Sequence, residues 1–222
     1  ASKSRGLGDV YKRQGIDITM FMSDMNLNEN LSSTPQDRRE LMDLVERMQG
    51  AFTTIAKSKI PTIALAHGFC IGGATSLVSA CDIRLATKDA KFSIGETKLG
   101  LVADVGVIQR MPKIVSSGDM NELALTGRIF DGEHAEKIRF VSKAYGNSDE
   151  LFEAGEKLAN EISSNSKRIV QATKEALEKS SNLTVDQGLE YAKLWSTSFL
   201  VSEDLREGVM AFLEKRDPKF NE

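Results

Sequence analysis

A short apolar run, a glycine-rich turn and a helical pattern follow one another directly in residues 62–80. The run Thr62–Ala66 (TIALA) lies between a proline and a glycine and predicts a buried strand. Glycines then mark a turn, and Ala74–Ala80 predicts a short helix. Further strands are expected at Ile83–Thr87, Lys91–Ile94 and Phe140–Tyr145. Strands that alternate with helices indicate an α/β fold with crossover connections.

Helical patterns occupy both flanks of these strands. Thr34 is expected to cap a helix that begins at Pro35, with Asp37 three residues after the cap. Helical spacing recurs at Val105–Ile114, where Pro112 bends or ends the helix, and at Met120–Leu125. Three or four amphipathic helices are expected after residue 148. We therefore divide the chain into a partial α/β core at 15–148 and a helical region at 149–222.

Residues 1–14 differ from the rest of the chain. The segment ASKSRGLGDVYKRQ has no apolar periodicity, and most of its charges are basic. It resembles translated sequencing-adaptor sequence; a disordered tail or a transit peptide are the alternatives. We expect a non-native or disordered segment that does not pack on the core, and a natural chain that begins upstream of Gly15.

Composition argues against several classes of function. The formal net charge is −3, and 27% of residues are charged, with no basic stripe that would suit nucleic acid. No apolar run is long enough to span a membrane. The two cysteines and two histidines show no metal-ligand spacing, so we expect no metal site. Both cysteines stand among apolar residues, which suits burial in a reducing compartment.

The first candidate site is the turn HGFCIGG at residues 67–73. Paired glycines let backbone N–H groups approach a ligand where a side chain would block it. At the N-terminus of a helix these N–H groups lack partners and carry partial positive charge. Such a turn can hold a phosphate or the oxyanion of an enolate. The glycines could equally serve only for close packing.

The second candidate is the pair of carboxylates Glu96 and Asp104, which are eight residues apart. The apolar residues 101–103 stand beside Asp104, which is an unusual setting for a surface charge. Two carboxylates in an apolar pocket can act as base and acid on carbon, because burial raises the pKa of one above that of the other. The alternatives are that Asp104 caps the helix from Val105 and that Glu96 is merely solvated.

Taken together, the run HGFCIGGATSLVSACDIRLATKDAKFSIGETKLGLVADVG resembles the crotonase, or enoyl-CoA hydratase/isomerase, superfamily. The resemblance extends from Gly15 to the C-terminus. Within it, GETKLGLVADVGVIQRMPK followed by NELALTGR is most similar to the Δ(3,5)-Δ(2,4)-dienoyl-CoA isomerases. The resemblance implies an α/β fold, a spiral of ββα turns that here lacks its first strands, followed by a helical trimerisation region.

The resemblance also implies roles for particular residues. The N–H groups of Ile16 and Gly73 would form an oxyanion hole for a CoA thioester, and Glu96 and Asp104 match the two catalytic carboxylates of the isomerases. Ser76 stands where hydratases carry Glu and the dienoyl isomerases carry Asp, which argues against hydration and makes Ser76 a substrate-binding candidate. The resemblance further implies that Phe212 and Lys215 cover the acyl and CoA site of a neighbouring subunit.

The implied activity is the isomerisation of 3,5-dienoyl-CoA to 2,4-dienoyl-CoA in the β-oxidation of unsaturated fatty acids. The resemblance implies an acyl-CoA substrate and no metal or separate cofactor. It also implies a homo-oligomer, either a trimer or a hexamer. An intracellular location in a mitochondrion or peroxisome is implied. The alternatives are a Δ3,Δ2-enoyl-CoA isomerase that uses Glu96 alone, a hydratase relative, or a binding-only protein. The pattern leaves open which carboxylate acts at which carbon.

Overall fold

The computed structural model describes residues 34–220, which form two compact units. The first unit comprises residues 34–58 and 62–155, and the second comprises residues 59–61 and 156–220. The division of the chain at residues 14/15 and 148/149 stays a prediction. Residues 1–33, and with them Ile16 and the N-terminal segment, lie outside the described residues.

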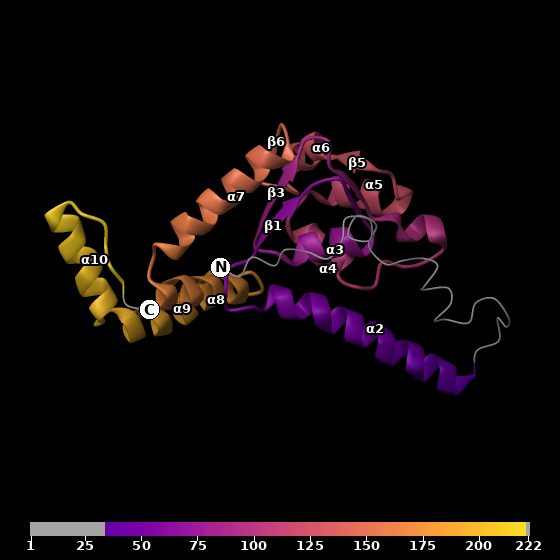
Figure 1. The fold of residues 1–222 in the computed structure, drawn as a ribbon. Coiled ribbons are helices and arrows are strands. Elements are labelled where there is room, and N and C mark those ends of the chain that lie inside the picture. Colours follow the sequence, from indigo (N-terminus) through magenta and orange to yellow (C-terminus); the bar gives the residue numbers. More distant parts are fainter. Residues whose placement is uncertain (1–33, 221–222) are drawn as a thin grey trace. The chain divides into compact units, whose positions relative to one another are not determined.

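Helix α2 (Pro35–Ala56) begins as the sequence predicts (Figure 1). The hydroxyl of Thr34 accepts a hydrogen bond from the N–H of Asp37 (3.2 Å). The carboxylate of Asp37 in turn accepts one from the N–H of Thr34 (2.7 Å). This reciprocal pair is a capping box, and it satisfies two backbone donors that a helix N-terminus otherwise leaves unpaired.

Two three-stranded sheets form the centre of the first unit, in the orders β1-β3-β6 and β2-β4-β5. Neighbouring strands are parallel except for the antiparallel pair β4 and β5. The strand bounds are β1 (Ile63–Ala66), β2 (Phe69–Ile71), β3 (Ile83–Thr87), β4 (Lys91–Ser93), β5 (Phe130–Asp131) and β6 (Lys143–Tyr145).

Successive pieces of the chain add one strand to each sheet. Strands β1 and β2 are followed by helix α3 (Gly73–Ala80), and β3 and β4 then pair with β1 and β2 respectively. A second helical stretch follows β4. Strands β5 and β6 then add the third strand to each sheet. The first unit is therefore an α/β spiral of ββα turns. The helical elements after β4 and β5 are η2 (Gly95–Leu99), α4 (Val107–Arg110), η3 (Met111–Lys113), α5 (Ser117–Thr126) and α6 (Gly132–Lys137).

An aromatic cluster fills the core between these layers. Phe92, Phe130 and Phe140 are 0–4% exposed, and their ring centroids lie 5.5–6.2 Å apart. Stacked and edge-to-face contacts of this kind add specific attraction to the burial of apolar area. They connect β4, β5 and the segment before β6, so the phenylalanines join successive turns of the spiral.

The second unit is helical. It contains the end of α7 (Ser148–Ser163) and the helices α8 (Lys167–Ser180), α9 (Val185–Phe199) and α10 (Glu203–Glu214). The expected amphipathic helices are therefore confirmed, and a hydroxyl side chain caps the start of each of the last three. The hydroxyl of Tyr191 donates to the carboxylate of Glu175 (2.8 Å) and joins α9 to α8. No helix in the described part of the chain is long and apolar enough to cross a membrane.

Candidate functional site

The glycine turn between β2 and α3 is held by two neighbouring strands. The N–H of Gly72 donates to the carbonyl of Ser93 in β4 (2.9 Å). The buried hydroxyl of Thr75 lies against that carbonyl (3.0 Å) and the carbonyl of Cys70 in β2. Gly72 has φ +58°, a conformation that an L side chain rarely adopts, and it places Gly73 first in α3. The N–H of Gly73 therefore stands at the open end of a helix, where it lacks an intrahelical partner.

Glu96 lies directly beside this turn. A Cβ atom added to Gly72 would stand 3.3 Å from Glu96 Oε1, so the carboxyl group occupies the space that a side chain at position 72 would need. The short helix η2 carries Glu96 and is anchored by Thr97, whose hydroxyl donates to the carbonyl of Ala124 in α5 (2.7 Å). In the sequence, Gly72 is marked only as part of the turn, because its approach to Glu96 depends on the pairing of β2 with β4.

The electrostatics of Glu96 suit a proton-transfer group. Burial raises the pKa of its half-buried carboxyl, and the negative charge of Asp104 raises this pKa further, while a hydrogen bond from the N–H of Glu96 itself opposes the shift. Among the described residues no donor reaches the buried Oε2 atom. A buried acceptor without a partner is costly in a fold, and it is free to receive a proton or a hydrogen bond.

Asp104 lies in the irregular segment between η2 and α4. The capping interpretation is wrong, because Gly106 is the N-cap of α4 and the helix begins at Val107 instead of Val105. The expected apolar pocket does not enclose this carboxylate: Asp104 is exposed, and of the apolar residues 101–103 only Ala103 is buried. The negative charge of Asp104 nevertheless contributes to the raised pKa of Glu96, and a catalytic site that contains both carboxylates stays a prediction.

Ser76 lies one helical turn after Gly72 on α3. Its N–H donates to the carbonyl of Gly72 (3.1 Å), and positions four apart share a helix face. The side chain is 0% exposed, and within residues 34–220 its hydroxyl has no hydrogen-bond partner. A second unpaired buried polar atom thus belongs to the helix that begins beside Glu96.

The remaining predicted site residues lie elsewhere or outside the description. Ile16 is outside the described residues. Phe212 is 82% exposed on α10, and Lys215 follows that helix with φ +55°. Both belong to the second unit, so their proposed contacts with substrate stay predictions.

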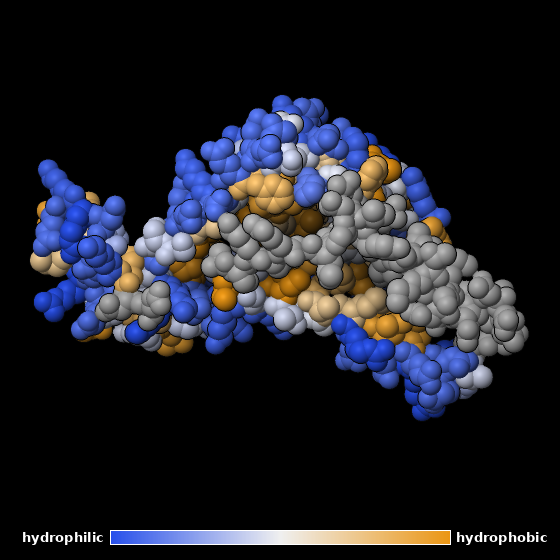
Figure 2. Space-filling view, in the orientation of Figure 1, coloured by the Kyte–Doolittle hydropathy of each residue, from blue (hydrophilic) through white to orange (hydrophobic). Residues whose placement is uncertain are grey.

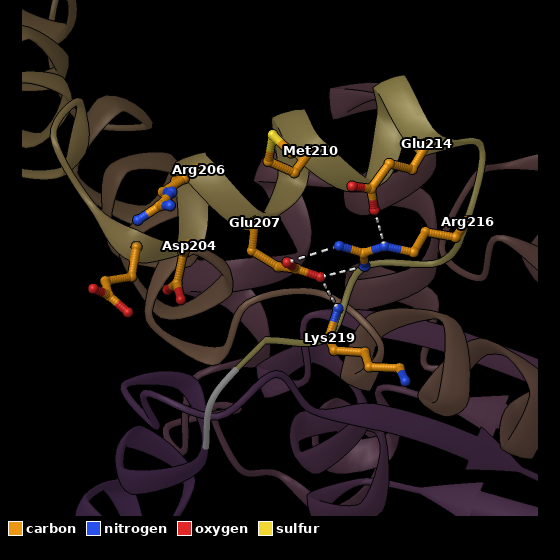
Figure 3. A pocket seen from close by; sticks show the side chains of 8 residues that line it. Asp204, Arg206, Glu207, Met210, Glu214, Arg216 and Lys219 are labelled. Atoms are coloured by element: carbon orange, nitrogen blue, oxygen red, sulfur yellow. Dashed lines mark hydrogen bonds and ion pairs between the residues drawn. The ribbon is translucent and has the colours of Figure 1, made fainter.

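A charged groove along α10 does not add a second candidate. Arg216 lies between Glu207 and Glu214 and forms ion pairs of 2.6 Å with each (Figure 3). The N–H of Lys219 also donates to Glu207 (2.7 Å), and these contacts lower the pKa of Glu207 to about 2. These ion pairs and hydrogen bonds therefore hold the C-terminal segment against α10.

Two further kinds of site can be sought in the described residues, a reactive cysteine and a metal centre. Burial raises the pKa of the Cys70 thiol to about 11, so it is not a thiolate at neutral pH. No group of three or more His, Cys, Asp or Glu side chains within residues 34–220 is placed to hold a metal ion. The groups that the candidate site offers are two carboxylates, one serine hydroxyl and the N–H groups of a helix N-terminus.

The chain is similar in sequence to proteins that carry a name. The chain is 46% identical over 188 residues to the mitochondrial Δ(3,5)-Δ(2,4)-dienoyl-CoA isomerase of Dictyostelium discoideum, covering 85% of this chain and 64% of that protein. It is 39% identical over 215 residues to the mitochondrial enzyme of that name from Rattus norvegicus, covering 96% of this chain and 65% of that protein. The chain thus spans less than two thirds of the length of either relative.

The fold also has solved counterparts. A crystal structure of enoyl-CoA hydratase from Bacillus anthracis superposes with a TM-score of 0.80 over 96% of this chain and 93% of that chain. The identity in that comparison is 23%, so it bears on the fold alone. The family model for enoyl-CoA hydratase/isomerase matches residues 18–222. The chain belongs to the enoyl-CoA hydratase/isomerase family.

Proposed function

We propose that the protein is a CoA-thioester isomerase that converts 3,5-dienoyl-CoA to 2,4-dienoyl-CoA. The observation that carries the proposal is the half-buried carboxyl of Glu96 beside the Gly72–Gly73 turn, whose Oε2 atom has no hydrogen-bond partner among the described residues. Relatives named for this reaction are up to 46% identical to the chain.

The reaction needs two proton transfers and a place for negative charge. One carboxylate removes a proton from C2 of the substrate, and the electrons spread through the diene into the thioester oxygen. The N–H groups of Gly73 and Ile16 would stabilise that oxygen; the loss of one such donor typically costs about 3 kcal/mol in the transition state. The other carboxyl group, protonated beforehand, delivers its proton to C6 and becomes a carboxylate, which leaves the substrate with double bonds at C2 and C4. The atoms and charges balance without a redox cofactor or a metal.

Ser76 and the two C-terminal residues complete the proposed site. The unpaired hydroxyl of Ser76 would donate to a polar atom of the bound substrate. Phe212 and Lys215 would contact the acyl chain and the CoA of a neighbouring subunit. The proposed assembly is a trimer or a hexamer, in a mitochondrion or a peroxisome as the names of the relatives suggest.

A Δ3,Δ2-enoyl-CoA isomerase that uses Glu96 alone is the second candidate. It is favoured by the exposure of Asp104, which contrasts with the burial of Glu96. A direct assay separates the two: 3,5-dienoyl-CoA and 3-enoyl-CoA are offered to the purified full-length protein. A 2,4-dienoyl thioester absorbs at longer wavelength than its precursor because its diene is conjugated with the carbonyl. Preference for 3-enoyl-CoA would overturn the dienoyl assignment, and binding without turnover of either substrate would support a binding-only protein.

A further inference from the structure

Asp104 stands on a segment without regular structure, so something else must hold it in place. Residues 101–104 form neither helix nor strand, and a short bend leads from them into α4. One end of the segment is tied to η2, because the N–H of Leu101 donates to the carbonyl of Glu96 (3.0 Å). A loop changes its conformation at little cost in free energy unless contacts hold it. A proton-transfer group, in contrast, must be held accurately beside the atom on which it acts.

Helix α2 supplies the second tie. The side-chain amide of Gln49 donates from Nε2 to the main-chain oxygen of Asp104 itself (2.7 Å). Thr53 follows four residues later on the same face of α2, and its hydroxyl lies 3.3 Å from Nη2 of Arg110. Nη1 of that arginine donates to the carbonyl of Val105 (3.3 Å). Two consecutive carbonyls, at 104 and 105, are therefore held from outside the segment.

The contact of Gln49 fixes the orientation of the Asp104 peptide group. A carbonyl held in one direction restricts the backbone angles at its residue, and these angles direct the side chain. Gln49 contacts the main chain and leaves the carboxylate of Asp104 available. The exposure of Asp104 makes the tie more important, because little packing surrounds that side chain.

We propose that Gln49 is a positioning residue of the site: it holds the main-chain oxygen of Asp104 and thereby places the Asp104 carboxylate for proton transfer. The proposal rests on the proposed function. Gln49 lies 55 residues before Asp104 in the sequence, on a helix that carries no candidate catalytic group.

A double-mutant cycle tests this role. Gln49→Met keeps the length of the side chain and removes the donor. Because a displaced acid–base group acts on the transition state, we expect kcat to fall by about 10- to 100-fold with KM within about twofold. In an Asp104→Asn background, Gln49→Met should change kcat by less than about twofold, because the group that it positions is already disabled. Gln36→Met is the matched control and should leave kcat unchanged, since the side chain of Gln36 donates to the exposed Glu40 of its own helix (2.9 Å).

Two results would overturn the proposal. One is an unchanged kcat in Gln49→Met; the other is an equal loss in the presence and absence of the Asp104 carboxylate, which would indicate a general structural effect. Amide hydrogen exchange provides a readout that does not need activity: Gln49→Met should speed exchange in residues 101–106 and leave β3 unchanged. If the parent enzyme has no turnover, the proposed function fails, and equal exchange rates in parent and variant would separately show that Gln49 does not hold the segment.

Discussion

The two carboxylates of the site differ mainly in their surroundings. Glu96 is half-buried against the glycine turn, and Asp104 is exposed on an irregular segment. Removal of the negative charge from either one tests whether it transfers a proton. We expect Asp104→Asn and Glu96→Gln each to lower turnover of 3,5-dienoyl-CoA by about 10²–10⁴-fold, while unfolding shows the fold intact.

Ser76→Ala is the control for that pair, because a neutral hydroxyl is a poor base and its removal should have a far smaller effect. The substitution also removes a buried hydroxyl that has no hydrogen-bond partner among the described residues. The variant should therefore be at least as stable as the parent. Full activity in Asp104→Asn would reduce the assignment to a one-carboxylate isomerase.

The raised pKa of Glu96 also has a consequence for stability. Between the ordinary carboxyl value of 4.5 and the higher value in the fold, the folded chain binds more protons than the unfolded chain, so stability decreases as pH rises through this window. Glu96→Gln removes the charge that is costly to bury. We expect the variant to be more stable than the parent at neutral pH, by less than about 1 kcal/mol because water screens a half-buried group.

Urea unfolding at several pH values measures this difference. The stabilities of parent and variant should converge below the ordinary pKa, where the parent carboxyl is protonated in both states. An advantage of Glu96→Gln that is constant with pH would contradict the assignment of the effect to the Glu96 charge.

At the scale of elements, local patterns predicted most of the regular structure. Strand β3 has the expected bounds, β1 and β4 each differ from expectation by one residue, and the Thr34 cap is confirmed. Strand β2 lies within the run that was interpreted as a turn, and β5 has only two residues; both strands are defined by their pairing with β4. The predicted helix at 105–114 is two short pieces, because Gly106 with φ +115° caps the first and Pro112 starts a tighter turn.

The same limit applies to the candidate site. Glu96, Asp104 and the glycine turn carry local signals in the sequence. The contact of Gln49 with Asp104 and the approach of Glu96 to Gly72 carry no such signal, because they join segments that only the fold brings together.

Gly132, at the junction of β5 and α6, has no room for a side chain. A Cβ atom on Gly132 would lie 1.9 Å from the main-chain oxygen of Thr87, and backbone cannot move aside as a flexible side chain can. We expect Gly132→Ala to lower the free energy of unfolding by roughly 1–3 kcal/mol or more. Gly118→Ala is the matched control in α5, since a Cβ atom there would lie 3.8 Å from Ser116 Oγ, and it should be neutral or stabilising. Equal stability of the two variants in urea would show that the contact is relieved without cost.

At the scale of the whole molecule, the second unit exposes more apolar surface than its own helices cover. Figure 2 shows apolar atoms in orange among the blue polar surface. The residues that carry it on α9 and α10 and in the turns before them are more than 60% exposed; they are Val185, Leu189, Leu194, Leu200, Val201, Phe212 and Leu213. Exposed apolar residues gathered on a few helices typically mark an interface between proteins.

We expect this surface to be covered by other copies of the chain in the proposed trimer or hexamer. Leu189→Glu places a charge on the 63% exposed leucine of α9 and should dissociate the assembly, because a buried unpaired charge is costly. Leu125→Glu makes the same change at a 75% exposed leucine of α5 in the first unit and should leave assembly unchanged. Sedimentation velocity at micromolar concentration separates the species. A parent protein that sediments as a stable monomer would contradict the prediction, as would dissociation by Leu125→Glu in place of Leu189→Glu, because the interface would then lie on the first unit.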